Sequence, residues 1–221
     1  ATMFLPESGI EDPNGCNQIR ATAILADLTV DPLFFYRDYY GDMDRSLNYA
    51  GYQVYPFPYD WRLDLRATAD ALDQFIADHH WSTVILLGHS MGGLLARTYI
   101  SDPGRASKVQ AVITVGTPYW GAPAMTGHMR DGSVPIPIVP DPGIVRAIIR
   151  NALGPMELLP SQAYFEHVTL DNNYGTNSGY FIGAGQSQPY ATLTETQDYF
   201  SGDHQQNRAL LNNAATFHSS R

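Results

Sequence analysis

The segment Gly88-His89-Ser90-Met91-Gly92 has the residue types and spacing that best fit a chemical role. Its pattern, G-x-S-x-G, is typical of a nucleophile elbow, a sharp turn between a strand and a helix that exposes the serine hydroxyl. In such a turn, the backbone N–H of the following residue, Met91, donates to the oxyanion that forms when serine attacks a carbonyl group. A glycine-rich turn with an incidental serine is the alternative interpretation, so the flanking residues matter.

The residues on both sides of this segment favour a nucleophile elbow over an incidental serine. Residues 84–87 are all apolar, as expected of a strand buried on both faces of a parallel sheet. After the motif, apolar residues recur at helical spacing and predict a helix over 91–102. We expect the elbow to need Gly88 and Gly92, because a Cβ at either position would clash with the neighbouring strand or helix. We therefore interpret Ser90 as a nucleophile.

A serine nucleophile needs a base and an acid that orients the base. In the elbow architecture these follow the serine in the order acid, then histidine. Asp198 and Asp203 both lie beyond the late strand predicted over Tyr180–Gly185, where the acid belongs. His128 and His167 come too early in the chain, which leaves His204 and His218 as candidate bases.

The elements around the elbow alternate between strands and helices. Patterns of apolar residues, glycine and proline predict these elements: helices over Ile19–Leu28, Asp42–Ala50, a stretch beginning at Asp60 or Asp64, and Ile144–Leu153; strands over Gly51–Phe57, Val109–Val115 and Tyr180–Gly185; and a hairpin arm over Ala191–Phe200. This order indicates an α/β fold with a parallel sheet and right-handed crossovers. We expect one domain over residues 1–221, with 119–160 as a cap or lid insertion over the site; the alternative for this segment is an ordinary surface helix.

Composition narrows the possible partners. The 221-residue chain carries a net charge of −9 and has no cluster of basic residues. We therefore expect no binding to nucleic acid and at most peripheral contact with a lipid interface. No run of about 18 apolar residues predicts a membrane span, so we expect a soluble protein, secreted or cytoplasmic. The scattered histidines predict no metal site, and serine chemistry needs no cofactor.

Five segments together resemble a known family. They are PYDWR (58–62), GHSMGG (88–93), GTPYWGAP (116–123), residues 139–161 and YFIGAGQ (180–186). In this order they are similar to the lecithin:cholesterol acyltransferase and phospholipid:diacylglycerol acyltransferase family of α/β-hydrolases, which includes bacterial lipase-like members. The resemblance implies an α/β-hydrolase fold, a mostly parallel sheet with helices on both faces. It also implies an acyl-serine mechanism on lipid esters, with the acyl group passing to water in lipases and to an alcohol in transferases.

The resemblance also assigns the acid and the base. Gly202-Asp203 matches the first two positions of the family's Gly-Asp-Gly-Thr-Val-type motif, and His204 is followed by a hydrophobic pair and an asparagine as in the family. Adjacent side chains of an extended segment point in opposite directions, so neighbours make an awkward acid–base pair. We therefore expect that a segment between 203 and 204 is missing from this sequence. The family resemblance also implies an initial strand and a loop that gives the second oxyanion N–H; because no such element precedes residue 50, we expect an N-terminal strand to be missing as well. If the chain is complete, His218 is the better base.

Two tryptophans are candidates for a substrate pocket. Trp120 follows the carboxyl end of a predicted strand, where ligands bind in α/β folds, and we expect it to line the pocket. Trp61 is better explained as core filler beside an ion pair between Asp60 and Arg62. The sequence thus predicts a serine esterase or lipase for a small lipid or ester substrate, with acyltransferase activity as an extension. The alternative is a non-catalytic α/β-hydrolase-fold protein that binds lipid or a partner.

Overall fold

The computed structural model describes residues 5, 21–23, 27–30, 35–38, 40–132, 141–168, 192–202 and 206–219. The chain divides into two compact units, one of residues 19–60 and one of residues 1–18 and 61–221. The predicted strand over Tyr180–Gly185 and the residues Asp203 and His204 lie outside the described residues.

The unit of residues 19–60 holds a hairpin and a helix. Strands β1 (Asp27–Val30) and β2 (Phe35–Asp38) pair antiparallel, and α1 (Gly41–Tyr49) confirms the helix expected there. The helix expected over Ile19–Leu28 is wrong, because its last two residues belong to β1. The strand expected over Gly51–Phe57 is also wrong: these residues form no ladder, and Pro56 lacks the N–H that a ladder uses.

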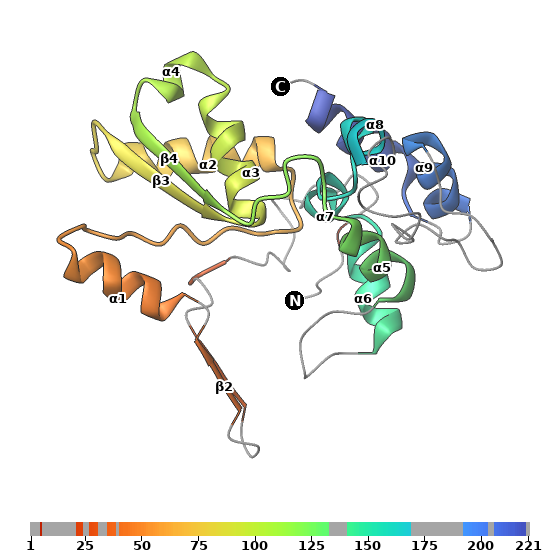
Figure 1. The fold of residues 1–221 in the computed structure, drawn as a ribbon, viewed down its shortest axis with the longest axis horizontal. Coiled ribbons are helices and arrows are strands. Elements are labelled where there is room, and N and C mark those ends of the chain that lie inside the picture. Colours follow the sequence, from red (N-terminus) through yellow and green to blue (C-terminus); the bar gives the residue numbers. More distant parts are fainter. Residues whose placement is uncertain are drawn as a thin grey trace. The chain divides into compact units, whose positions relative to one another are not determined.

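The second unit begins with an α/β part. Its elements are α2 (Leu65–Asp78), β3 (Val84–His89), α3 (Met91–Ile100), α4 (Pro103–Ala106) and β4 (Val109–Val115). The two strands are parallel, as predicted. Helix α3 packs against both strands and α2 packs against α3 (Figure 1). Asp64 caps α2 by accepting a 2.7 Å hydrogen bond from the Arg66 backbone N–H, which decides between the two predicted starts.

One face of the two strands departs from the expectation that both faces are buried. Ile85 and Leu87 of β3 are 41% and 37% exposed, and Ile113 and Val115 of β4 are each 50% exposed. Alternate residues of a strand point to opposite faces, so these four side chains share one face. Helix α3 covers the other face, which explains why only that one is shielded.

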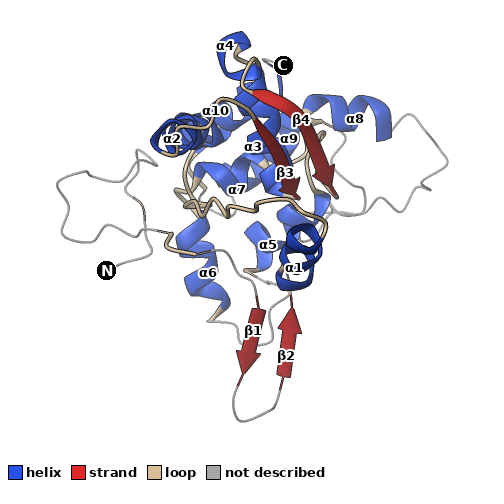
Figure 2. Cartoon of the chain, turned by 90° about the vertical axis from the view of Figure 1, so that its left-hand side faces the viewer, coloured by secondary structure: helices blue, strands red, loops and turns tan. Residues whose placement is uncertain are grey.

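The other elements described in this unit are helices (Figure 2). Its elements are α5 (Pro123–Asp131), α6 (Pro142–Ile149), α7 (Leu153–Glu157), α8 (Gln162–Val168), α9 (Leu193–Gly202) and α10 (Arg208–Ser219). Buried side chains of α5, α6, α7, α9 and α10 form one hydrophobic core. The single helix expected over Ile144–Leu153 is instead two, because Pro155 cannot donate the helical hydrogen bond to Asn151.

The hairpin arm expected over Ala191–Phe200 is wrong, since α9 occupies this segment. The helix begins with a capping box: the Glu195 N–H donates to Thr192 Oγ1 at 3.2 Å, and the Thr192 N–H donates to Glu195 Oε2 at 3.1 Å. Tyr199 and Phe200 are buried in the helical core. The helix thus buries both aromatic rings on one side, which an alternating strand would not do.

Candidate active site

Ser90 lies at the turn between β3 and α3 with a backbone conformation that few residues adopt. Its φ is 52° and its ψ is −120°. Such a conformation costs about 1–3 kcal/mol in a residue other than glycine, so the surrounding structure has to hold it. The Ser90 N–H donates to the Val115 carbonyl at the end of β4 at 2.8 Å. The predicted elbow is present, and β4 anchors it.

Not all of the glycines expected to be essential at the elbow lack room for a side chain. A Cβ at Gly88 would lie 2.5 Å from the carbonyl group of Gly92, so this position has no room for a side chain. A Cβ at Gly92 would meet nothing within 4 Å, and the clash expected there is wrong. The crowded position is Gly93, where a Cβ would overlap Thr117 Oγ1. The glycine pair needed for packing is therefore 88 and 93.

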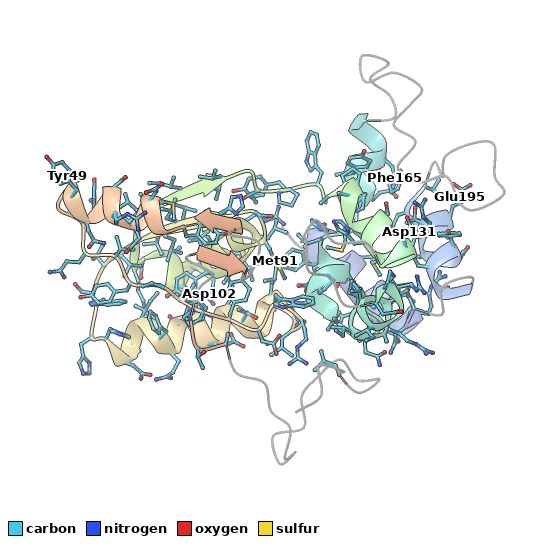
Figure 3. All side chains as sticks on the ribbon, turned by 90° about the horizontal axis from the view of Figure 1, so that it is seen from below. Tyr49, Met91, Asp102, Asp131, Phe165 and Glu195 are labelled. Carbon is cyan, nitrogen blue, oxygen red and sulfur yellow. The ribbon has the colours of Figure 1, made fainter. Side chains whose placement is uncertain are left out.

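Met91 is the first residue of α3, and its backbone N–H lies at the positive end of the helix dipole. Its side chain packs against α7: a Cβ at Gly154 would lie 2.6 Å from Met91 Cε and 2.9 Å from the Leu63 carbonyl oxygen. Met91 lies on the side of the α/β part nearest to the helices that carry Asp131 and Phe165 (Figure 3). The expected oxyanion donor is thus held between the sheet and the helical core.

Trp120 lies in the loop after β4, and the segment before α8 holds it in place. Its carbonyl oxygen accepts hydrogen bonds from the Ser161 N–H at 2.8 Å and from Ser161 Oγ at 3.0 Å. The Ala122 N–H donates to the Leu158 carbonyl at 2.7 Å. The indole is 48% exposed. The loop backbone is therefore fixed while the Trp120 side chain stays half-exposed.

Arg97 is a residue of this region that the sequence reasoning missed. Its guanidinium carbon lies 5.2 Å from the centre of the Tyr119 ring and 5.8 Å from that of Phe217. Burial lowers the pKa of this guanidinium. These contacts join α3, the loop after β4 and α10. No sequence signal distinguishes Arg97 from a solvent-facing helical arginine.

The described residues include one of the two candidate bases. His218 lies near the end of α10, where its Nε2 is 2.8 Å from the Glu157 carbonyl oxygen. Asp203 and His204 lie outside the described residues, so their distances to Ser90 stay untested. Of the expected site, the described residues therefore include Ser90, the N–H of Met91 and the loop that carries Trp120.

The segment YDWR also differs in part from the expectation. Arg62 is 1% exposed and lies inside the protein, but Trp61 is 42% exposed and is not core filler. The Gly154 N–H donates to the Arg62 carbonyl at 3.2 Å. The backbone of this segment therefore supports α7, next to the elbow.

A second residue that the sequence reasoning missed is Glu157, at the end of α7. Its side chain is completely buried. Burial raises its pKa to about 9, and the negative charge of Asp64 adds to this effect. The sequence signal is weak: one acid within the apolar run Pro155–Pro160.

Two further findings concern membranes and metals. In the described part of the chain, no helix is long and apolar enough to cross a membrane. Among the same residues, no three histidine, cysteine, aspartate or glutamate side chains gather as metal ligands would.

Comparisons with known proteins place the chain in a family. No curated protein sequence matches it. A chain of the crystal structure of the Tle4–Tli4 complex has a similar fold, with a TM-score of 0.52 and 22% sequence identity over 73% of this chain and 40% of that chain. The protein thus spans less than half of the length of this structural relative. The family model of lecithin:cholesterol acyltransferase matches residues 6–215, and the chain therefore belongs to the lecithin:cholesterol acyltransferase family.

Proposed function

We propose that this protein is a serine esterase that cleaves carboxylic esters of lipids through an acyl-serine intermediate. The observation that carries the proposal is the backbone of Ser90, held at positive φ between β3 and α3. A strained serine at this turn has a catalytic explanation and no evident structural one, since a glycine would adopt the same conformation at no cost. Membership in the lecithin:cholesterol acyltransferase family supports the same chemistry.

The proposed reaction has two halves. Ser90 Oγ attacks the ester carbonyl carbon while a histidine takes the hydroxyl proton, and the Met91 N–H donates to the oxyanion. The leaving alcohol takes the proton from the histidine as the ester bond breaks. Water then attacks the acyl-serine and gives a proton to the histidine. The histidine returns this proton to Ser90 Oγ as the acyl–serine bond breaks, which releases the carboxylic acid and restores Ser90. An alcohol in place of this water makes the same enzyme an acyltransferase.

We assign His204 as the base and Asp203 as the acid that orients it. The family motif around both residues supports this assignment. The position of His218 also supports it, because His218 Nε2, the atom that would face a serine, lies 2.8 Å from the Glu157 carbonyl oxygen.

We further assign the acyl pocket to the loop of Trp120 and to the segment 119–160 as a cap. Exposed apolar side chains of this segment support the assignment: Trp120 is 48% exposed and Ile144 is 46% exposed. The net charge of −9 favours uncharged or zwitterionic lipid esters over anionic ones.

Hydrolysis of p-nitrophenyl esters of increasing acyl length tests the proposal. We expect Ser90→Ala and His204→Gln to lower kcat by about 10⁴–10⁶ and His218→Gln to lower it far less. Circular dichroism of each variant controls for folding. Equal hydrolysis by wild-type protein and Ser90→Ala would contradict the proposal. A folded wild-type protein that binds these esters without hydrolysing them would instead identify a non-catalytic lipid-binding member of the family.

A further inference from the structure

Helix α7 is buried along its whole length and contacts the N-terminus of α2. All five of its residues are buried, and Glu157 is 0% exposed. Glu157 Oε2 accepts a 3.0 Å hydrogen bond from the Leu65 N–H, the first N–H of α2. Since the first N–H groups of a helix have no partner within the helix, Glu157 satisfies a donor that α2 leaves open.

The Glu157 carboxyl group lies beside the Asp64 carboxyl group. Burial alone would raise the pKa of Asp64, but hydrogen bonds from the Arg66 side chain and backbone lower it overall. Burial and the charge of Asp64 raise the pKa of Glu157 to about 9. Two carboxyl groups can share a hydrogen bond only when one of them is protonated, and these shifts put the proton on Glu157 at neutral pH.

Among the described residues, the charged and titratable groups near Glu157 come from the N-terminus of α2 and from α10. Around the N-terminus of α2, Asp64 is the negative group and Arg66 Nη2 is a positive group 3.7 Å from Glu157 Oε1. From α10, His218 Nε2 contacts the Glu157 carbonyl oxygen at 2.8 Å. Arg66 also donates to Asn213 of α10 at 2.5 Å. Because Arg66 already binds the Asp64 carboxylate, it does not fully compensate a charge on Glu157.

The other end of α7 meets the elbow. Gly154 lies against the Met91 side chain and the backbone of 61–63, with no space for a Cβ, and its N–H donates to the Arg62 carbonyl. Glu157 and Gly154 are three residues apart in one short helix, so a displacement of α7 at Glu157 moves the surface against which Met91 packs.

We propose that Glu157 is a positioning residue: in its neutral form it holds α7 on the N-terminus of α2 and thereby fixes the surface of α7 against which the Met91 side chain packs. Ionisation of Glu157 places a second negative charge next to Asp64 inside the protein and loosens α7. The contact between Met91 and α7 then changes. The role of Met91 as an oxyanion donor rests on the proposed esterase function. The coupling between Glu157 and Met91 does not depend on that function.

The coupling can be measured without any reaction, by NMR of protein labelled at the methionine methyl groups with ¹³C. The chain has six methionines, and the spectrum of Met91→Leu assigns the Met91 signal. We expect the Met91 methyl shift to titrate between pH 7 and 10 in the wild-type protein, with a midpoint at about pH 9. In Glu157→Gln, which keeps a neutral side chain of the same shape, the Met91 shift should stay constant over this range.

Glu166→Gln is the matched control. Glu166 is an exposed acid of α8 that pairs with Gln162, and the same substitution there should leave the Met91 titration unchanged. A Met91 signal that does not move in the wild-type protein, or that titrates equally in Glu157→Gln, would overturn the proposal.

A fluorophosphonate probe extends the test to the proposed reaction. We expect the rate of Ser90 labelling to fall above about pH 9 in the wild-type protein and in Glu166→Gln, but not in Glu157→Gln. The absence of labelling at every pH would overturn the esterase function alone. A Met91 signal that titrates in the wild-type protein but not in Glu157→Gln would still support the coupling.

Discussion

At the residue scale, the backbone of Ser90 distinguishes this serine from the other serines that the structure describes. Its positive φ is shared, among the described residues other than glycine, by His80 alone. The Ser90 N–H is bonded to Val115, and the turn closes only because Gly88 and Gly93 carry no Cβ. Close packing on both sides thus holds a conformation that would otherwise relax.

We expect alanine substitutions at two glycines of the elbow, Gly92 and Gly93, to change the stability of the protein in opposite directions. Gly93→Ala should lower the free energy of unfolding by about 1–3 kcal/mol, because its Cβ would overlap Thr117. Gly92→Ala should raise it by up to about 1 kcal/mol, because alanine has the higher helix propensity and its Cβ finds open space. Urea unfolding of the two variants measures both effects. Equal destabilisation by the two substitutions would contradict the packing described for the turn.

At the element scale, long apolar runs and clear helical spacing predict helices and strands correctly, whereas a short alternating pattern does not. The apolar run before Ser90, the helical spacing after it and the apolar run 109–115 gave β3, α3 and β4, because these elements are specified by their own residues. The segment 191–200 alternates like a strand, yet the Thr192–Glu195 capping box makes it α9. Recognising that box would have corrected the prediction.

The residues of the candidate site also differ in how far the sequence alone can predict them. Ser90 and Met91 can be predicted as site residues because one contiguous motif contains them both. Glu157 and Gly154 cannot, because their roles arise from contacts with Leu65 and Met91, which are 92 and 63 residues away in the chain. Tertiary contacts of this kind leave no periodic pattern in the sequence.

In the loop that carries Trp120, we expect an alanine substitution at Gly121 to destabilise the protein, and Gly127 in α5 provides a matched control. Gly121 has a φ of +97°, and a Cβ there would lie 2.5 Å from Pro160 Cα. Gly121→Ala should therefore destabilise the protein by about 1–3 kcal/mol or more, through both strain and overlap. Gly127→Ala in α5 should cause no loss, since its Cβ would meet nothing within 4 Å. Thermal unfolding of both variants checks the pair, and a similar loss in Gly127→Ala would argue against a specific constraint at Gly121.

At the scale of the whole molecule, the buried acid should make stability depend on pH. The pKa of Glu157 rises from an ordinary value of 4.5 to about 9 on folding, so between these values the folded protein binds a proton that the unfolded chain releases. Stability linked to Glu157 is therefore complete below about pH 4.5, declines as the pH rises and is lost by about pH 9.

Urea unfolding from pH 5 to 9 measures this contribution. The free energy of unfolding of the wild-type protein should fall with pH relative to that of Glu157→Gln, and Glu166→Gln should follow the wild type. Comparing the variants at each pH cancels the titration of the histidines, which they share. Parallel pH dependence of wild-type protein and Glu157→Gln would show that Glu157 is ionised in the folded state.

The central claim is that Ser90 is a nucleophile, and covalent trapping tests it most directly. The full chain is incubated with a fluorophosphonate, and the modified residue is located by mass spectrometry of proteolytic peptides. We expect one adduct, on Ser90, that is absent from Ser90→Ala and from unfolded wild-type protein. A folded wild-type protein without this adduct, or with the same adduct in Ser90→Ala, would contradict it.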